Sequence, residues 1–429
     1  MPKSTLIRIA RWIAAAELPV IVLISPALLF PTPKRLAALA LVPNIWICAK
    51  ITTGRFLPRT PLNFALYLML LMVGVSLYAT FDVTFSLGKV AGLLLGLLVY
   101  WASVRWVETK ERLAMGTAAF VAAGAGLAVI GLLGTNWMEK FPVLGAVIAR
   151  LPRVIRGLPG AEEGFQPNAV AGCLVMFVPL QVALSWRLFV DSRTAAPGTR
   201  FRTRLAFVIS MSLLALTGGT LLLTQSRGAW IGMAMAGLAF CVWYGRQTRW
   251  VAAAILAAVL IAGIAIGPER LATMAVNQAG PGMAGNVEGR LELWSQALDG
   301  IQDFPITGMG MNTFRKAMPP LYPVSIPSPD LDVAHAHNHL LQVALDLGIP
   351  GLIAYIALWG LLVVMLVQVY RSSTDPWTRA TAGGIGAGLM AHFTFGMTDA
   401  IPLGAKVGVL FWLAVALVTA CAARIRASA

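Results

Sequence analysis

Charged residues are scarce in this chain: 12% of its 429 residues are Asp, Glu, Lys or Arg, whereas 58% are hydrophobic. Soluble domains carry about 25% charged residues, so this composition excludes an ordinary soluble protein. The mean hydropathy is +0.77, and many apolar runs approach the ~20 residues that cross a bilayer as a helix. We therefore predict an all-α polytopic integral membrane protein.

Cysteine is also rare, with four residues that lie in or at the ends of apolar segments and form no CxxC motif. This pattern argues against a disulfide framework and against a thiolate metal site. The cysteines are Cys48, Cys173, Cys241 and Cys421.

Acidic residues are few as well, 18 against 33 basic ones, which gives a net charge of +15. Such a charge could indicate nucleic-acid binding, but most of the Lys and Arg residues fall in short loops on one side of the membrane if the N-terminus is inside. That placement follows the positive-inside rule, so we expect no nucleic-acid partner. The basic residues left on the outer side, among them Lys89, Lys140 and Arg315, are expected to contact anionic lipids rather than to act in catalysis.

The apolar segments predict about twelve transmembrane helices, of which the second is the weakest because it is short. No small-residue cleavage site follows the N-terminal basic stretch, so the first segment is expected to be an uncleaved span. The segments cover residues 13–31, 36–49, 62–80, 86–104, 114–134, 168–186, 205–224, 228–244, 250–267, 351–370, 380–397 and 405–423.

The chain is expected to divide into five parts. Five helices occupy residues 1–134, four occupy 168–267 and three occupy 339–429, while two long outer segments lie between them. The first outer segment, 135–167, holds Arg150, Arg153 and Arg156 at three-residue spacing among apolar residues. This spacing favours a basic helix on the membrane surface, although a solvated linker is the alternative and Pro152 opposes a long helix.

The second outer segment, 268–338, is predicted to be a large, partly helical loop that carries catalysis. Within it, Leu291, Trp294, Leu298 and Ile301 recur at helical spacing. They predict one apolar face on an amphipathic helix of about 13 residues.

Three of the four histidines stand close together in "HAHNH", at His335, His337 and His339. A metal site with the nearby Asp330 or Asp332 is one interpretation, but the pattern is not HExxH. Asn338 is a favourable N-cap, and a helix that begins there separates His337 from His339. We therefore expect His337 to be functional and the other two to be polar neighbours, with a purely structural cluster as the alternative.

Two outer arginines stand out. Arg227 interrupts an apolar run in "LLLTQSRGAWIGM", and a charge so near hydrocarbon usually has a functional partner. Arg290 is expected at the first turn of the amphipathic helix, where anions are favoured. Together with His337 they suggest a phosphate or diphosphate ligand, whereas contact with lipid headgroups for Arg227 and a surface charge for Arg290 are the alternatives.

These residues form a pattern that resembles a known family. His337, Asn338, Gly348 and Gly351 are similar to the H-[NSQ]-x9-G-x-x-G signature of the O-antigen ligases, a superfamily that includes O-antigen polymerases and O-linked oligosaccharyltransferases. Further matches are "SRGAW" at 226–230, "GR" at 289–290, "PITGMG" at 305–310 and "QPNAVAG" at 166–172.

The resemblance implies a metal-independent glycosyltransferase with the GT-C architecture, in the bacterial inner membrane, whose active site faces the periplasm. It would transfer O-antigen from undecaprenyl diphosphate to the lipid A core oligosaccharide, without a cofactor. It also implies that His337 is essential and that Arg227 and Arg290 bind the diphosphate. A polymerase or oligosaccharyltransferase of the same superfamily is the nearest alternative, and a transporter of lipid-linked glycan or a small anion is a more distant one.

The expected reaction is a single displacement with inversion, in which neutral His337 accepts the proton of the attacking sugar hydroxyl. Gln166, Asn168 and Asn338 are candidates for contacts with the glycan or the acceptor, although Asn168 could instead cap its own helix. Gly348 and Gly351 are expected to end one helix and allow the next to begin.

Overall fold

The computed structural model describes residues 3–32, 34–141, 144–158, 161–266, 287–323 and 333–428. Over these residues the chain is helical, and its β contacts are limited to two isolated bridges. The predicted all-α class is therefore confirmed. Asp330 and Asp332, the acidic residues of the metal interpretation, lie outside the described residues.

All twelve predicted apolar segments are helical over most of their length. The helices and 3-10 turns are α1 (Lys3–Ala15), α2 (Glu17–Leu29), η1 (Arg35–Ala40), α3 (Leu41–Thr53), α4 (Asn63–Ala79), α5 (Val83–Trp106), α6 (Lys110–Gly134), α7 (Gly145–Ile148), α8 (Pro167–Leu174), α9 (Phe177–Thr194), α10 (Pro197–Leu223), α11 (Arg227–Tyr244), α12 (Arg246–Ile266), α14 (Val287–Asp303), α15 (Phe314–Leu321), α16 (His339–Ser372), α17 (Pro376–Gly396), η4 (Lys406–Gly408) and α18 (Val409–Ser428).

Within the described part of the chain, seven helical segments are long and apolar enough to cross a membrane, or up to eight if α1 and α2, bent by 49°, form one span. The chain is therefore a multi-pass membrane protein. Helix α4 is apolar but shorter, with 17 residues, so the number of twelve spans stays a prediction.

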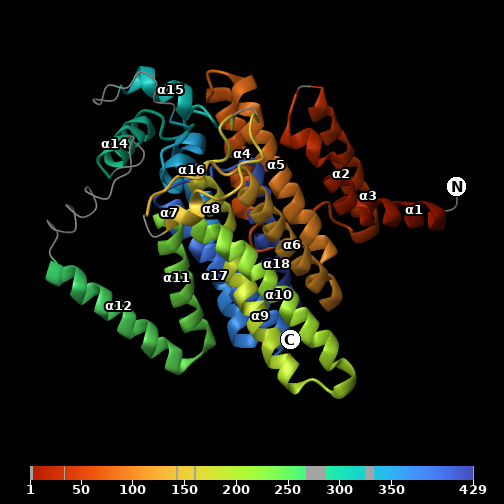
Figure 1. The fold of residues 1–429 in the computed structure, drawn as a ribbon. Coiled ribbons are helices and arrows are strands. Elements are labelled where there is room, and N and C mark those ends of the chain that lie inside the picture. Colours follow the sequence, from red (N-terminus) through yellow and green to blue (C-terminus); the bar gives the residue numbers. More distant parts are fainter. Residues whose placement is uncertain are drawn as a thin grey trace.

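A bundle of long helices forms the core of the molecule (Figure 1). Helix α17 packs against α9 and α11, α5 against α18, and α4 against α16. Large aromatic side chains fill the interior, including the buried Trp101, Phe177 and Trp412. In Figure 1, α1–α3 lie to one side of this bundle, and α12 leans away from it on the other. Helices α14 and α15 lie across one end, which is the end that carries the candidate site.

Helix α16 begins where the sequence predicts. The Asn338 side chain caps it by accepting hydrogen bonds from the backbone N–H groups of Leu340, at 2.9 Å, and Leu341, at 3.3 Å. The predicted break at Gly348 is also present, because this residue has φ of 70° inside the helix. A Cβ atom on Gly348 would lie 2.1 Å from the carbonyl oxygen of Ile306, so this approach of two backbones requires glycine.

The break ties the outer loop to the bundle. Two backbone hydrogen bonds of 2.7 Å connect the segments on either side of it: Met309 N–H to Leu345 O, and Ile349 N–H to Pro305 O. The "PITGMG" motif is therefore a docking segment, which holds α14 and α15 against the first turns of α16.

Helix α14 is longer than predicted and buries a different face. Leu293 and Ala297 are buried, whereas Leu291 and Leu298 of the predicted apolar face are about half exposed. The predicted face is therefore only partly buried: Ile301 packs against the same cluster of buried residues and Trp294 is half-buried, but Leu291 and Leu298 are not. The contact is shifted because Ala297 and Gly300 let the helix approach Met309 and Leu345.

The predicted basic surface helix is reduced to a single turn, α7, and residues 151–157 are not helical. The backbone N–H groups of Val154 and Ile155 instead bond to the carbonyl of Leu133, at 2.8 and 3.0 Å, at the end of α6. Pro152 prevents helix continuation, and Arg153 donates to the carbonyl of Trp137 at 2.6 Å.

Candidate functional site at one end of the bundle

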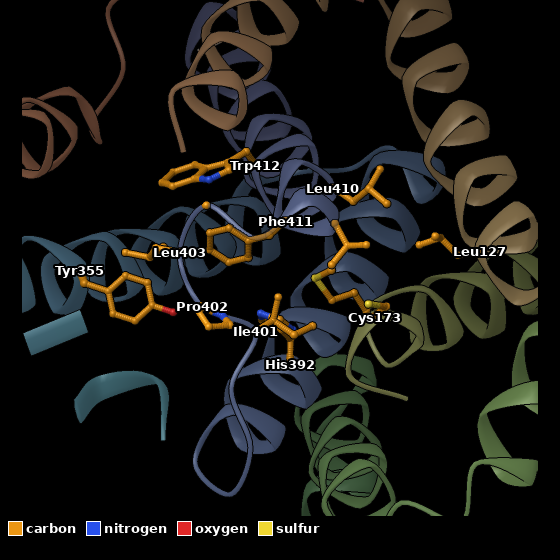
Figure 2. Close-up of a pocket in the computed structure, with 14 residues that line it drawn as sticks. Leu127, Cys173, Tyr355, His392, Ile401, Pro402, Leu403, Leu410, Phe411 and Trp412 are labelled. Atoms are coloured by element: carbon orange, nitrogen blue, oxygen red, sulfur yellow. The ribbon is translucent and has the colours of Figure 1, made fainter. Parts of the chain in front are cut away.

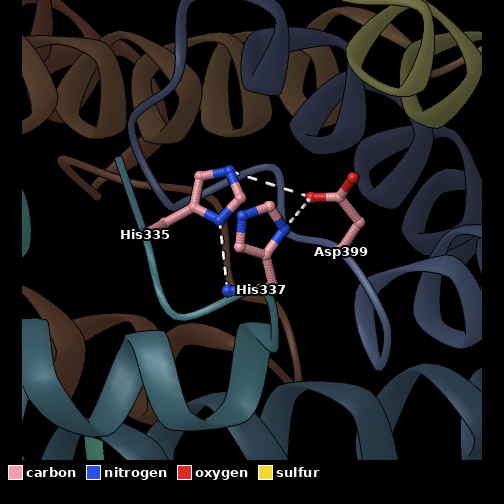
Figure 3. Close-up of side chains that lie close together, drawn as sticks. All are labelled: His335, His337 and Asp399. Atoms are coloured by element: carbon pink, nitrogen blue, oxygen red, sulfur yellow. Dashed lines mark hydrogen bonds and ion pairs between the residues drawn. The ribbon is translucent and has the colours of Figure 1, made fainter. Parts of the chain in front are cut away.

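Two histidines and an aspartate meet at the start of α16. The Nδ1 atom of His337 lies 3.0 Å from Asp399 Oδ1, and Nε2 of His335 lies 3.8 Å from the same oxygen (Figure 3). The two imidazole rings are 4.3 Å apart between centroids. Asp399 follows α17, so chain segments that are 62 residues apart form this cluster.

The hydrogen bonds define the roles of the ring nitrogens. The His337 backbone N–H donates to His335 Nδ1 at 3.2 Å, so in neutral His335 the proton lies on Nε2, facing Asp399. The carboxylate of Asp399 accepts from Nδ1–H of His337, which leaves Nε2 of neutral His337 as an acceptor.

Electrostatics favours these protonation states. Burial opposes ionisation of the Asp399 carboxyl, but the hydrogen bond and charge of His337, the charge of His335 and the Ala400 N–H outweigh it and hold its pKa below the usual value. Burial, followed by repulsion from His337, lowers the pKa of His335 to about 4. His335 is therefore neutral near pH 7, and Asp399 is ionised.

A polar relay holds the turn that carries the histidines. The buried Gln342 accepts from the backbone N–H of Ala336 at 2.9 Å and donates to Asp346 Oδ1 at 2.9 Å. Asp346 therefore fixes the orientation of the Gln342 amide. His337 itself has φ of 49°, a left-handed conformation that is uncommon outside glycine. The neighbouring contacts thus maintain a strained backbone at this residue.

Arg290 and Lys140 each interact electrostatically with Asp399 and with Arg227. Burial lowers the pKa of Arg290, while attraction to Asp399 raises it and repulsion from Arg227 lowers it further. Lys140 is exposed, but partial desolvation by the surrounding protein, followed by repulsion from Arg227, also lowers its pKa, and attraction to Asp399 opposes this change. The predicted arginines therefore share one electrostatic environment with the histidine cluster, and Lys140 belongs to it as well.

The predicted glycan-contact residues lie beside this group. Gln166 occupies the cap position of α8 without a side-chain cap bond, and Pro167 begins the helix. Asn168 is therefore not the cap, and its Oδ1 instead accepts from Lys140 Nζ at 3.3 Å. Asn338 caps α16 and makes a long bond, 3.4 Å, from its amide to the carbonyl of Met397.

His339 points away from this cluster. It is buried, its Nδ1 lies 3.0 Å from the hydroxyl of Tyr355, and its ring packs against Phe393. The separation of His337 from His339 that the cap at Asn338 predicts is therefore present. His335, however, shares Asp399 with His337 and is more than a neighbour.

The cluster also has the composition of a metal site. His335, His337 and Asp399 each offer one ligand atom, and these atoms lie within 4.8 Å of one another. Two imidazoles and a carboxylate suit a divalent ion such as zinc. Metal coordination by His337 Nδ1, however, would replace its hydrogen bond to Asp399 and bring His337 into a different tautomer.

A small cavity inside the bundle is not the substrate site. It is lined by Tyr355, His392, Trp412 and other residues of α16–α18 and their neighbours (Figure 2). Its volume of ≈ 20 Å³ holds about one water molecule, whereas sites for small organic ligands measure about 300 Å³ or more. This cavity is therefore too small to hold a sugar.

Sequence patterns alone did not single out Asp399, and they assigned Lys140 to contacts with lipid rather than to this site. Asp399 has a detectable signal, because it is an acidic residue in a short outer turn between two apolar segments. The argument that singled out Arg227, that a charge near hydrocarbon needs a partner, applies to it equally.

Together, the fold and the site define a multi-pass helical membrane protein with a His–Asp pair beside clustered cations at one end of its bundle. Residues 212–356 match the family model of the O-antigen ligases, which supports the assignment of the chain to the O-antigen ligase superfamily. The matched range includes Arg227, Arg290 and His337 but not Asp399 or Lys140. No curated protein gives a significant match. The family implies a glycosyltransferase-like ligase or polymerase activity on a lipid-linked polysaccharide.

Proposed function

We propose that this protein is an O-antigen ligase of lipopolysaccharide biosynthesis. It transfers O-antigen polysaccharide from undecaprenyl diphosphate to a sugar hydroxyl of the lipid A core oligosaccharide. The reaction takes place on the periplasmic face of the bacterial inner membrane. The family match to residues 212–356 supports the class of reaction, and the clustering of charged residues at one end of the bundle supports a site at the membrane surface.

One observation carries the proposal: the hydrogen bond between His337 Nδ1 and Asp399. It favours the tautomer whose Nε2 accepts a proton, and the carboxylate stabilises the imidazolium that results. This is the arrangement of a general base oriented by an acidic partner. General-base catalysis of this kind contributes about 10² to 10⁴ in rate.

The proposed step is a single displacement. The acceptor hydroxyl oxygen attacks the anomeric carbon of the donor, and its proton passes to His337 Nε2. The bond between the anomeric carbon and the diphosphate oxygen breaks, and its electron pair leaves with undecaprenyl diphosphate. One glycosidic bond forms and one glycosyl–phosphate bond breaks. Because the hydroxyl attacks the face opposite the leaving diphosphate, the configuration at the anomeric carbon inverts.

Arg227 and Arg290 stabilise the leaving group in this mechanism. Negative charge develops on the diphosphate as the bond breaks, and guanidinium groups bind phosphate oxygens in a bidentate manner. The shared electrostatic environment of the two arginines and Asp399 supports this role. Removal of one such donor typically costs about 10² to 10³ in rate.

The choice of acceptor distinguishes a ligase from a polymerase of the same superfamily. Purified protein should be supplied with a lipid-linked O-antigen donor and either rough lipopolysaccharide or a second lipid-linked repeat unit. If the O-antigen of the donor is labelled, we expect the label to appear on lipopolysaccharide. Chain elongation on the lipid carrier without transfer to lipopolysaccharide would instead assign a polymerase.

A further inference from the structure

A short segment before α7 is bound to the start of α11 through one buried side chain. Gln225 is fully buried, and its Oε1 accepts from the backbone N–H groups of Lys140, at 2.9 Å, and Phe141, at 2.7 Å. Its Nε2 donates to the carbonyl of Met138 at 3.2 Å. A single amide therefore uses both of its ends to hold residues 138–141.

A second contact holds the same segment. The ring of Phe141 stacks on Trp230 of α11, with centroids 5.2 Å apart and an interplanar angle of 18°. Gln225 precedes Arg227 by two residues, and Trp230 follows it by three. Lys140 and Arg227 are thus attached to one rigid unit, and the positive φ of Gln225, 52°, marks the strained turn at its centre.

From this position, the Lys140 side chain extends toward α8. Its ammonium donates to Asn168 Oδ1 at 3.3 Å, which is a neutral partner. The ammonium also lies within electrostatic range of both Arg227 and Asp399. Lys140 and Arg227 therefore place two positive charges close together on one rigid unit, and such a pair favours an anionic ligand between them.

We propose that Lys140 is a third cationic ligand of the donor diphosphate and that Gln225 is the positioning residue that holds it there. This inference rests on the proposed function. An ammonium is a point charge that can bind an oxygen left over by two bidentate guanidinium groups. It therefore contributes most when both phosphates are present.

The test is equilibrium binding of radiolabelled undecaprenyl diphosphate and undecaprenyl phosphate to the full-length protein in nanodiscs. We expect Lys140→Gln to weaken diphosphate binding about tenfold, the usual size of a charged hydrogen bond, and monophosphate binding by much less. Lys140→Arg should retain most of the affinity. Lys406→Gln is the matched control, because Lys406 lies 3.9 Å over the ring of Phe30, and it should bind like the wild type.

Gln225 is tested by a double-mutant cycle. Gln225→Leu should weaken diphosphate binding, and Lys140→Gln combined with Gln225→Leu should be no weaker than the worse single variant. Melting temperatures identify variants that fail to fold. Because the Lys140 side chain is exposed, its variants should fold, so the test does not depend on the stability of the Gln225 variant.

The outcomes separate the two proposals. An unchanged diphosphate Kd in Lys140→Gln, alongside weakened binding in Arg227→Gln, would overturn the inference and leave the proposed function standing. Absence of diphosphate binding and of glycan transfer in the wild type would refute both.

Discussion

His337 combines a left-handed backbone with a hydrogen bond to a carboxylate from a distant segment. The cap at Asn338 directs the chain into α16 immediately after it, while Gln342 holds Ala336 immediately before it. The two anchors fix the backbone of His337, and the hydrogen bond to Asp399 restrains the rotation of its imidazole. A fixed base loses little entropy on reaction, which is the physical advantage of placing it at a helix start.

Substitution of Asp399 tests whether the carboxylate orients and stabilises the His337 imidazole. Asp399→Asn keeps the shape of the side chain but removes the charge that stabilises the imidazolium. It also removes the preference of His337 for a proton on Nδ1. We expect kcat to fall by about 10² to 10⁴, with little rise in the KM for the donor because the cations are retained. Steady-state kinetics measures both quantities, and a kcat within threefold of the wild type would contradict this role.

His335 predicts a pH dependence of stability. Its pKa in the folded protein is about 4, below the ~6.5 of an unfolded chain. Between these values the unfolded chain binds a proton that the folded chain does not, so stability falls as pH drops from about 6.5 towards 4. The melting temperature of His335→Gln should therefore decline less over this range than that of the wild type. Equal declines would show that His335 titrates normally.

Short-range sequence patterns identified several of the site residues. His337, Asn338, Gly348 and Arg227 each carry a short-range signal, namely a cap, a helix break or a charge beside hydrocarbon. Asp399 acts through a contact across 62 residues, and such pairing depends on how α16 and α17 pack. That packing is a tertiary property without a local signature, so the pairing of Asp399 with His337 could be found only in the folded structure, even though Asp399 itself stands out as an acidic residue in an outer turn.

The two-part helix α16 couples the outer loop to the bundle. Gly348→Ala would place alanine at φ of 70° and ψ of 177°, a region that is essentially limited to glycine and costs about 1–3 kcal/mol, and would force its Cβ to within 2.1 Å of Ile306 O. We expect a lower melting temperature and reduced transfer. Gly360→Ala in the same helix is the control, since no neighbouring atom lies within 4 Å of the Cβ position. A Gly348→Ala protein as stable as this control would show that the loop adjusts freely.

Helices α2 and α3 are held to α5 by a buried ion pair. Arg105 Nη1 lies 2.9 Å from Glu17 Oε2, and Trp46 donates to Glu17 Oε1 at 2.8 Å. Glu17→Ala leaves a largely buried guanidinium without its counter-charge, which costs about 3–5 kcal/mol, or roughly 3–5 °C in melting temperature. Glu17→Ala with Arg105→Met should recover much of this loss. No recovery in the double variant would mean that packing, not charge, is responsible.

Hydropathy predicts where the helices are more reliably than which faces they bury. The twelve apolar segments match observed helices because each residue contributes independently to the cost of leaving water. The buried face of α14 does not follow from hydropathy. Ala297 and Gly300 lie in the contact because their small size lets the helix approach its neighbours closely. A pattern that weighs only hydrophobicity selects Leu291 and Leu298, which are exposed.

The ionisable side chains of the proposed site are gathered at one end of the helix bundle. Within the described residues, Glu17 is paired with Arg105, and Asp346 is hydrogen-bonded to Gln342. These two carboxylates therefore have structural partners, whereas transport sites near the middle of a membrane use such groups for substrate. The arginines, Lys140 and the His–Asp pair are brought together by the ends of helices that are far apart in sequence. This distribution favours an enzyme that acts at the membrane surface.

The most direct test is the rate of O-antigen transfer to rough lipopolysaccharide by purified wild-type and His337→Ala proteins, both assayed in EDTA. We predict that the wild type remains active in the chelator. The transfer rate of His337→Ala should be at least about 10²-fold lower, while its melting temperature is unchanged. A His337→Ala protein as active as the wild type would contradict the role of His337 as the base. Loss of wild-type activity in EDTA, restored by Zn²⁺, would instead make His335, His337 and Asp399 metal ligands.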